Sequence, residues 1–139
     1  MITGHHSVSS NLRARVKAQA DESFTRQIPV SLDELPAPPE GWELELDTLI
    51  AIKLRGYCDP HTDDYQGRGP AGTPHLNLFW LVSDTSRRPS SLVADGMSVR
   101  MKPGDWAVFD DTQLHAFLAD GTWMGLAVQM VRREVNTSQ

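Results

Sequence analysis

The stretch Lys102-Pro-Gly-Asp-Trp-Ala-Val-Phe-Asp-Asp-Thr-Gln-Leu-His115 joins a Pro-Gly turn to a short apolar run and ends on a histidine. The run 105–109 combines aromatic and β-branched residues between turn-forming residues, which is typical of a β-strand. A second candidate strand, 114–118, begins beside the histidine. This stretch therefore predicts two strands joined by a turn, with His115 at the start of the second.

Similar short runs recur from Trp42 onward, separated by Gly, Pro, Asp and Ser. They cover residues 43–46, 48–55, 75–82, 91–94, 97–101 and 123–131. Eight short strands with turn residues between them predict a β-sandwich or barrel.

The N-terminal part has a different pattern. Four apolar residues recur every four positions among charged ones: Leu12, Val16, Ala20 and Phe24. This period predicts an amphipathic helix over residues 9–27, with its apolar face packed on the rest of the protein. Four prolines then lie within 28–41 and predict an extended connector. We expect one domain, 1–139, with the β-core over 42–133.

Composition indicates an ordinary globular protein, with 40% hydrophobic and 22% charged residues. The net charge of −5 does not favour nucleic acid as a partner. One cysteine, Cys58, allows no internal disulfide and fits a reducing compartment. No signal-peptide pattern and no stretch of membrane-spanning length is seen, so we expect a cytoplasmic protein without membrane partners.

The sequence His61-Thr-Asp63 follows the predicted strand 48–55 across a glycine. In an extended segment, residues two apart point to the same side, so the imidazole and the carboxylate can share one metal ion. His115 supplies a second imidazole. Two His and one carboxylate on one face of Fe(II) leave the other positions open for oxygen chemistry. Other residues compete with this set: Asp59 and Asp64 as the carboxylate, and His75 as a further ligand.

With these residues, the chain from about 49 to 131 resembles the double-stranded β-helix core of Fe(II)/2-oxoglutarate-dependent dioxygenases. The matching pieces are 54–63, 75–82 and 103–115. The resemblance implies a mainly-β jelly roll with an N-terminal helix, in which His61, Asp63 and His115 hold Fe(II). It also implies 2-oxoglutarate as cosubstrate and hydroxylation or demethylation of a substrate that the sequence does not identify.

The sequence departs from the family pattern where 2-oxoglutarate needs a cation. Many members carry a basic residue some ten positions after the second histidine, and here no Arg or Lys lies between His115 and Arg132. A carboxylate is best bound by such a charge. Lys53 and Arg55 are the candidates to supply it, with Arg100 as a weaker one. Alternatively, Lys53 and Arg55 are outward-facing charges on an edge strand. Two further residues are expected to bind the cosubstrate in the pocket: Tyr57 and Asn77.

Two other functions stay open. One is a cupin-type metalloprotein that does not use 2-oxoglutarate, since cupins share the jelly-roll architecture. The other is a catalytically inactive β-sandwich binding protein. Because the core is small and has a single helix, we expect an open site, which suits a macromolecular substrate. A homodimer whose partner closes the site would instead suit a small metabolite.

Overall fold

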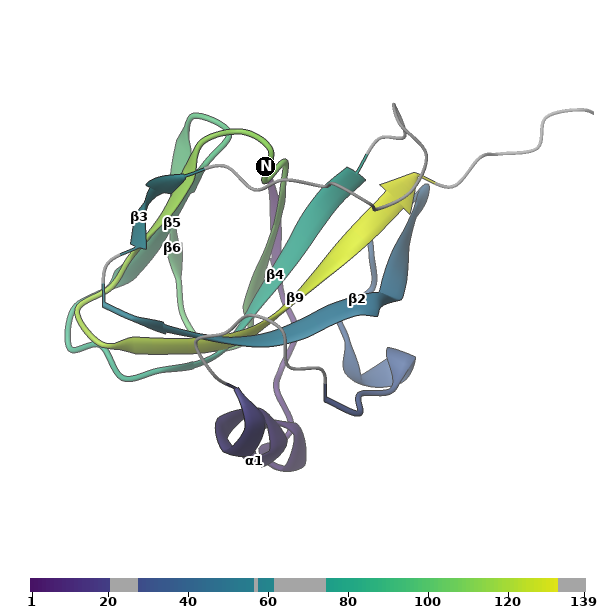
Figure 1. The fold of residues 1–139 in the computed structure, drawn as a ribbon, viewed down its shortest axis with the longest axis horizontal. Helices are drawn as coiled ribbons and strands as arrows, with labels where there is room; N and C mark the ends of the chain where they lie inside the picture. Colours follow the sequence, from purple (N-terminus) through teal and green to yellow (C-terminus); the bar gives the residue numbers. More distant parts are fainter. Residues whose placement is uncertain (21–27, 57, 62–74, 133–139) are drawn as a thin grey trace, which may run out of the picture.

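The computed structural model describes residues 1–20, 28–56, 58–61 and 75–132. Within these residues the chain forms two antiparallel β-sheets that face each other, with a helix packed outside one of them (Figure 1). The predicted mainly-β jelly roll with one N-terminal helix is confirmed. No described helix has the length and apolar character of a membrane span.

The larger sheet has the strand order β1-β7-β4-β9-β2, and the smaller sheet has the order β3-β8-β5-β6. The larger sheet consists of β1 (Ile2–His5), β7 (Asp105–Phe109), β4 (His75–Asp84), β9 (Thr122–Arg132) and β2 (Trp42–Arg55). The smaller sheet consists of β3 (Cys58–His61), β8 (His115–Leu118), β5 (Ser90–Ala94) and β6 (Met97–Met101). Strands that are far apart in the sequence thus become neighbours.

Strand β4 lies in the middle of the larger sheet and is buried on both faces. Alternate residues point to opposite faces of a sheet. Leu78 and Trp80 pack on the outer side, whereas Phe79 and Leu81 pack between the two sheets. This double burial explains why the strand reads as a continuous apolar run.

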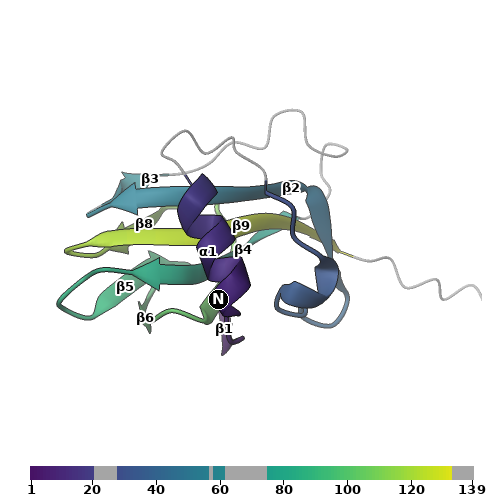
Figure 2. The ribbon, with the colours of Figure 1, turned by 90° about the horizontal axis from the view of Figure 1, so that it is seen from below.

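Helix α1 (Ser10–Gln19) covers the outer face of the larger sheet (Figure 2). Its Leu12 and Val16 are fully buried there, and the Ser9 side chain caps the helix by accepting a hydrogen bond from the Leu12 amide at 3.0 Å. The helix ends at Gln19, because Ala20 has an extended backbone with ψ of 135°. The predicted range 9–27 therefore extends beyond α1, and its last part, 21–27, lies outside the described residues.

A short 3-10 helix, η1 (Leu32–Glu34), lies within the segment 28–41 that was predicted to be an extended connector. Two of the predicted strands, 43–46 and 48–55, are one strand, β2. Its register against β9 shifts between Glu45 and Ile50, where the chain forms a bulge. The Thr48 hydroxyl donates to the Glu45 carbonyl at 2.7 Å and accepts the Gln129 amide at 2.8 Å, so the side chain replaces the lost strand pairing.

The first residues of the chain form a strand that the sequence analysis did not predict. Ile2–His5 forms β1, which pairs antiparallel with β7. The His6 amide donates to the Gly104 carbonyl at 2.8 Å, and the His6 ring packs on Trp80 with ring centroids 5.3 Å apart. His5 hydrogen-bonds to Asp105 at 2.8 Å. Contacts with distant residues fix this segment, and no local pattern in the sequence indicates them.

Candidate metal centre

Two histidines from distant parts of the sequence face each other in the smaller sheet. His61 ends β3 and His115 begins β8, and the two are direct partners in the antiparallel pairing. Their ring centroids are 4.2 Å apart with the planes tilted by 56°. His115 is 2% exposed, whereas His61 is partly exposed. The sheet therefore brings together the two imidazoles that the sequence predicted as metal ligands.

His115 is oriented by its own loop. Its Nδ1 lies 2.9 Å from the backbone carbonyl of Gln113. A carbonyl oxygen only accepts hydrogen bonds, so Nδ1 carries the hydrogen and Nε2 has the lone pair in the neutral ring. Metal-binding histidines are commonly held in this way by a hydrogen bond from the second ring nitrogen. The geometry of His115 therefore fits that of a metal ligand.

Aromatic side chains pack around the buried imidazole. The ring centroids of Phe109 and Phe117 lie 5.2 Å and 6.4 Å from that of His115. Phe117 also contacts Phe79 and Trp123 of the opposite sheet, at centroid distances of 5.0 Å and 5.3 Å. Aromatic side chains from both sheets therefore pack beside the histidine pair.

The predicted carboxylate ligand, Asp63, lies outside the described residues, as do Asp64 and the predicted pocket residue Tyr57. The described structure also leaves out the side chains of Asp59 and His75. Among the residues that are described, no group of three His, Cys, Asp or Glu side chains is placed to hold a metal ion. The histidine pair is thus the described part of the predicted ligand set.

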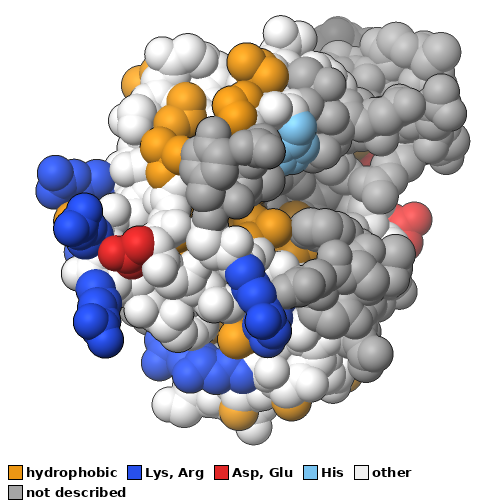
Figure 3. All heavy atoms as spheres, turned by 60° about the vertical axis from the view of Figure 1, so that its left-hand side comes forward, with side chains coloured by type: hydrophobic (Ala, Val, Ile, Leu, Met, Phe, Trp, Pro, Cys, Tyr) orange, Lys and Arg blue, Asp and Glu red, His pale blue; other side chains and the backbone are white. Residues whose placement is uncertain are grey.

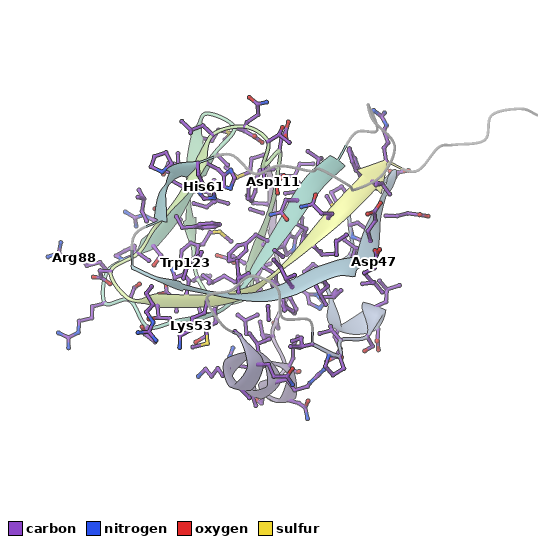
Figure 4. All side chains as sticks on the ribbon, in the orientation of Figure 1. Asp47, Lys53, His61, Arg88, Asp111 and Trp123 are labelled. Atoms are coloured by element: carbon purple, nitrogen blue, oxygen red, sulfur yellow. The ribbon has the colours of Figure 1, made fainter. Side chains whose placement is uncertain are left out.

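Lys53 and Arg55, the predicted cations for 2-oxoglutarate, are not brought to the histidine pair. Lys53 lies opposite Met124, which packs on the outer side of the larger sheet, and Arg55 lies two residues further along the same face. The residues between them point inward, as Leu54 does opposite Trp123. Figure 4 accordingly shows Lys53 and His61 on different sides of the molecule.

The prediction assumed that the face of the strand continues from Lys53 to His61. Instead, Gly56 has a positive φ of 69° and turns the chain from β2 in one sheet to β3 in the other. The alternation of faces is therefore interrupted. On the face that Figure 3 shows, several Lys and Arg side chains lie at the surface, at the left and lower part of the view. Exposed members of the basic set include Arg55, Arg87, Arg88 and Arg100.

Asn77 points into the space between the sheets, as its position on β4 beside Phe79 requires, and is 7% exposed. It hydrogen-bonds with Gln129, which in turn hydrogen-bonds with Asp111. The sequence analysis predicted neither of these two buried polar residues. Gln129 Nε2 donates to Asn77 Oδ1 at 3.4 Å and to Asp111 Oδ2 at 3.2 Å. A signal existed for Gln129, which is the polar residue on an inward position of the apolar run 123–131. No sequence signal marked Asp111. The neighbouring Asp110 has the same side chain, and only the structure shows that Asp111 is the buried one of the two.

No protein-family model and no curated protein sequence matches this chain. Several solved structures resemble it. A predicted oxalate decarboxylase from Thermotoga maritima is 16% identical with a TM-score of 0.43, covering 60% of this chain and 64% of that protein. The chain thus spans less than two thirds of the length of that protein.

A cupin protein from Bacteroides fragilis is 12% identical with a TM-score of 0.42, covering 75% of this chain and 89% of that protein. The DMSP lyase DddQ from Ruegeria pomeroyi is 14% identical with a TM-score of 0.41, covering 98% of this chain and 80% of that protein. At these identities and scores, the likenesses carry no inference about activity.

Proposed function

We propose that this chain is a mononuclear non-haem metalloenzyme in which His61 and His115 bind the metal ion. The observation that carries the proposal is their direct pairing across β3 and β8, with ring centroids 4.2 Å apart. A buried imidazole held by the Gln113 carbonyl, beside a partly exposed one, fits a metal site that is open on one side.

The donor set fits Fe(II). Two imidazoles alone suit zinc, copper, iron or nickel. With the carboxylate expected from Asp63, they form the set of two histidines and one carboxylate that is typical of non-haem Fe(II) oxygenases. When bound, iron would supply open coordination positions for oxygen chemistry. The residues Phe109 and Phe117 would shield the inner side of His115 from water.

The described interior offers no cation to a dicarboxylate cosubstrate. The positions that pack between the sheets in the described strands are apolar or uncharged in their large majority, and none is Lys or Arg. They include Ile52, Leu54, Phe79, Leu81, Leu92, Phe117 and Trp123. This interior favours a cupin-type metalloenzyme that does not use 2-oxoglutarate. Dependence on 2-oxoglutarate, which the sequence resemblance implies, stays a prediction.

The test is anaerobic calorimetry of Fe(II) binding, followed by titration of 2-oxoglutarate into the metal-loaded protein. We expect wild type to bind one Fe(II) per chain and His115→Ala and His61→Ala to lose that binding. His5→Ala is the matched control, because His5 lies on β1 and its partner is Asp105.

The outcomes separate three functions. Fe(II) binding without binding of 2-oxoglutarate supports the cupin-type metalloenzyme. Binding of both supports the 2-oxoglutarate-dependent oxygenase. Full Fe(II) affinity in folded His115→Ala contradicts the metal centre, and so does a wild-type protein that binds no metal, which would favour the binding-protein alternative.

A further inference from the structure

Three polar side chains are buried together between the two sheets. Asn77 comes from β4, Gln129 from β9 and Asp111 from the segment that links β7 to β8. Their exposed fractions are 7%, 6% and 3%. Polar groups at this depth are retained only when they are hydrogen-bonded or serve a function, because removing them from water is costly. We refer to Asn77, Asp111 and Gln129 as the polar triad.

The hydrogen bonds of the triad fix the orientation of the Gln129 amide. Its Nε2 donates to Asp111 Oδ2 at 3.2 Å and to Asn77 Oδ1 at 3.4 Å, so both amide hydrogens have acceptors. Turning the amide over would place its oxygen against the carboxylate oxygen of Asp111, which is also an acceptor. The other atom, Gln129 Oε1, is buried and receives no hydrogen bond from any residue in the described part of the chain. A fixed acceptor is therefore left inside the barrel.

Backbone contacts also fix the position of Gln129. The Gln129 amide N–H donates to the Thr48 hydroxyl in the β2 bulge at 2.8 Å. Across the sheet, Gln129 is the direct partner of Asn77 on β4. The position of the acceptor is thus set by the strands on both sides of β9, as a ligand-binding group requires.

The triad lies at the same end of the barrel as the histidine pair. Asn77 is the direct partner of Phe109 on β7, and the Phe109 ring lies 5.2 Å from that of His115. Asp111 belongs to the short segment that links Phe109 to His115. Figure 4 shows Asp111 and His61 at the same end of the molecule, with Trp123 deeper in the barrel.

We propose that the polar triad is a substrate-binding subsite that takes a hydrogen-bond donor, a hydroxyl or an amino group, through Gln129 Oε1. This inference rests on the proposed function, since it assigns the substrate class of the same site. An acceptor inside a barrel whose described inward positions include no Lys or Arg matches a donor and is a poor match for a carboxylate. Asn77 of the triad is the direct partner of Phe109, whose ring packs on His115, so the subsite adjoins an apolar wall and the substrate is an apolar alcohol or amine.

The test compares three ligands that share one ring and differ in the polar group: benzyl alcohol, benzylamine and benzoate. Binding to the full-length wild-type protein is measured by ligand-observed NMR, with and without Co(II). We expect benzyl alcohol or benzylamine to bind at least about tenfold more tightly than benzoate, the scale of one hydrogen bond to a buried acceptor. Preference between the first two identifies the donor as a hydroxyl or an amino group.

The variant Gln129→Met removes the acceptor while nearly keeping the length of the side chain. We expect it to bind the preferred ligand about tenfold more weakly and to keep its affinity for Co(II). Gln19→Met makes the same change on α1, outside the barrel, and is expected to bind like wild type. Equal binding of all three ligands by wild type overturns the subsite, and so does unchanged binding by folded Gln129→Met.

The two proposals fail separately. If wild type binds Co(II) but does not discriminate between the ligands, the metal centre stands and the subsite falls. If wild type discriminates but binds no Co(II), the subsite stands as a binding site and the metalloenzyme falls. The wild-type comparison tests the subsite even if Gln129→Met does not fold.

Discussion

The indole N–H of Trp80 donates a hydrogen bond to the backbone carbonyl of Gly104 at 3.1 Å. The same N–H lies 3.0 Å from the carbonyl of His6. One fully buried side chain of β4 thus joins the turn before β7 to the segment that follows β1. The tryptophan therefore adds to the pairing of β1 with β7 in holding the N-terminal segment.

We expect Trp80→Phe to lower the free energy of unfolding by about 1–3 kcal/mol, because it removes the N–H that the His6 and Gly104 carbonyls share and removes part of a buried ring. The measurement is urea denaturation followed by circular dichroism. Trp42→Phe, at a half-buried position, is the control and should have a smaller effect. Equal effects of the two changes would show that the hydrogen bond of Trp80 contributes little.

Gly125 on β9 lies where two strands and an aromatic ring approach closely. A Cβ at this position would lie 2.6 Å from the Trp80 carbonyl oxygen and 2.8 Å from the Phe79 ring. The Trp80 carbonyl belongs to the backbone of β4 and cannot move away without disturbing the sheet. We therefore expect Gly125→Ala to destabilise the protein by about 1–3 kcal/mol, as overpacking does. A shift of the urea midpoint at unchanged slope would measure this loss. An alanine variant as stable as wild type would contradict the close approach.

Glu34 in η1 forms an ion pair with Arg15 of α1 and hydrogen bonds with Ser31. The backbone hydrogen bond from Ser31, followed by those from Arg15 and the Ser31 hydroxyl, lowers the pKa of Glu34 from 4.5 to about 2. The folded state therefore binds this proton less readily than the unfolded state does. The resulting stability is present above pH 4.5 and is lost as the pH falls towards 2.

Unfolding measured between pH 2 and 5 tests this pH dependence. In wild type, we expect the urea midpoint to fall more steeply with decreasing pH than in Glu34→Gln, which has no proton to take up at this position. Glu40→Gln is the control for loss of an acidic side chain from the same connector. Parallel curves for wild type and Glu34→Gln would contradict the role of Glu34.

Metal binding should also raise the stability of the folded protein. A ligand that binds only the folded state at a hundred times its Kd adds about 2.7 kcal/mol to the free energy of unfolding. We expect Co(II) to raise the Tm of wild type and of His5→Ala but not that of His115→Ala. A shift of the same size in His115→Ala would show that the stabilising ion binds elsewhere.

Much of the fold can be predicted from the sequence because each strand carries its own local pattern. Residues 78–82 are all apolar, and the structure explains this by burial of β4 on both faces. The strand β1 was missed because Ile2–His5 has no such pattern and is held by partners about a hundred residues away. Long-range pairing of a short segment leaves no local signal.

The candidate site could be predicted only in part. His61 and His115 were predicted because His61 belongs to the sequence His61-Thr-Asp63 after the strand 48–55, and His115 ends the strand-and-turn stretch 102–115. Lys53 was predicted to face the same site as His61. Side chains alternate between faces only within one strand, and Gly56 turns the chain from β2 into the other sheet before His61. The triad partner Asp111 was missed because burial of a loop carboxylate is decided by tertiary packing.

The Thr48 hydroxyl offers a last test, which links the bulge in β2 to the polar triad. It accepts the Gln129 amide N–H at 2.8 Å, and Thr48→Val keeps the shape of the side chain while leaving that N–H without an acceptor. We expect a loss of about 1–3 kcal/mol in the free energy of unfolding. We also expect weaker binding of the ligand that wild type prefers, because Gln129 loses its backbone anchor. Thr3→Val, at an exposed position on β1, is the matched control. If Thr48→Val is destabilised but binds that ligand like wild type, the bulge supports the fold without positioning Gln129.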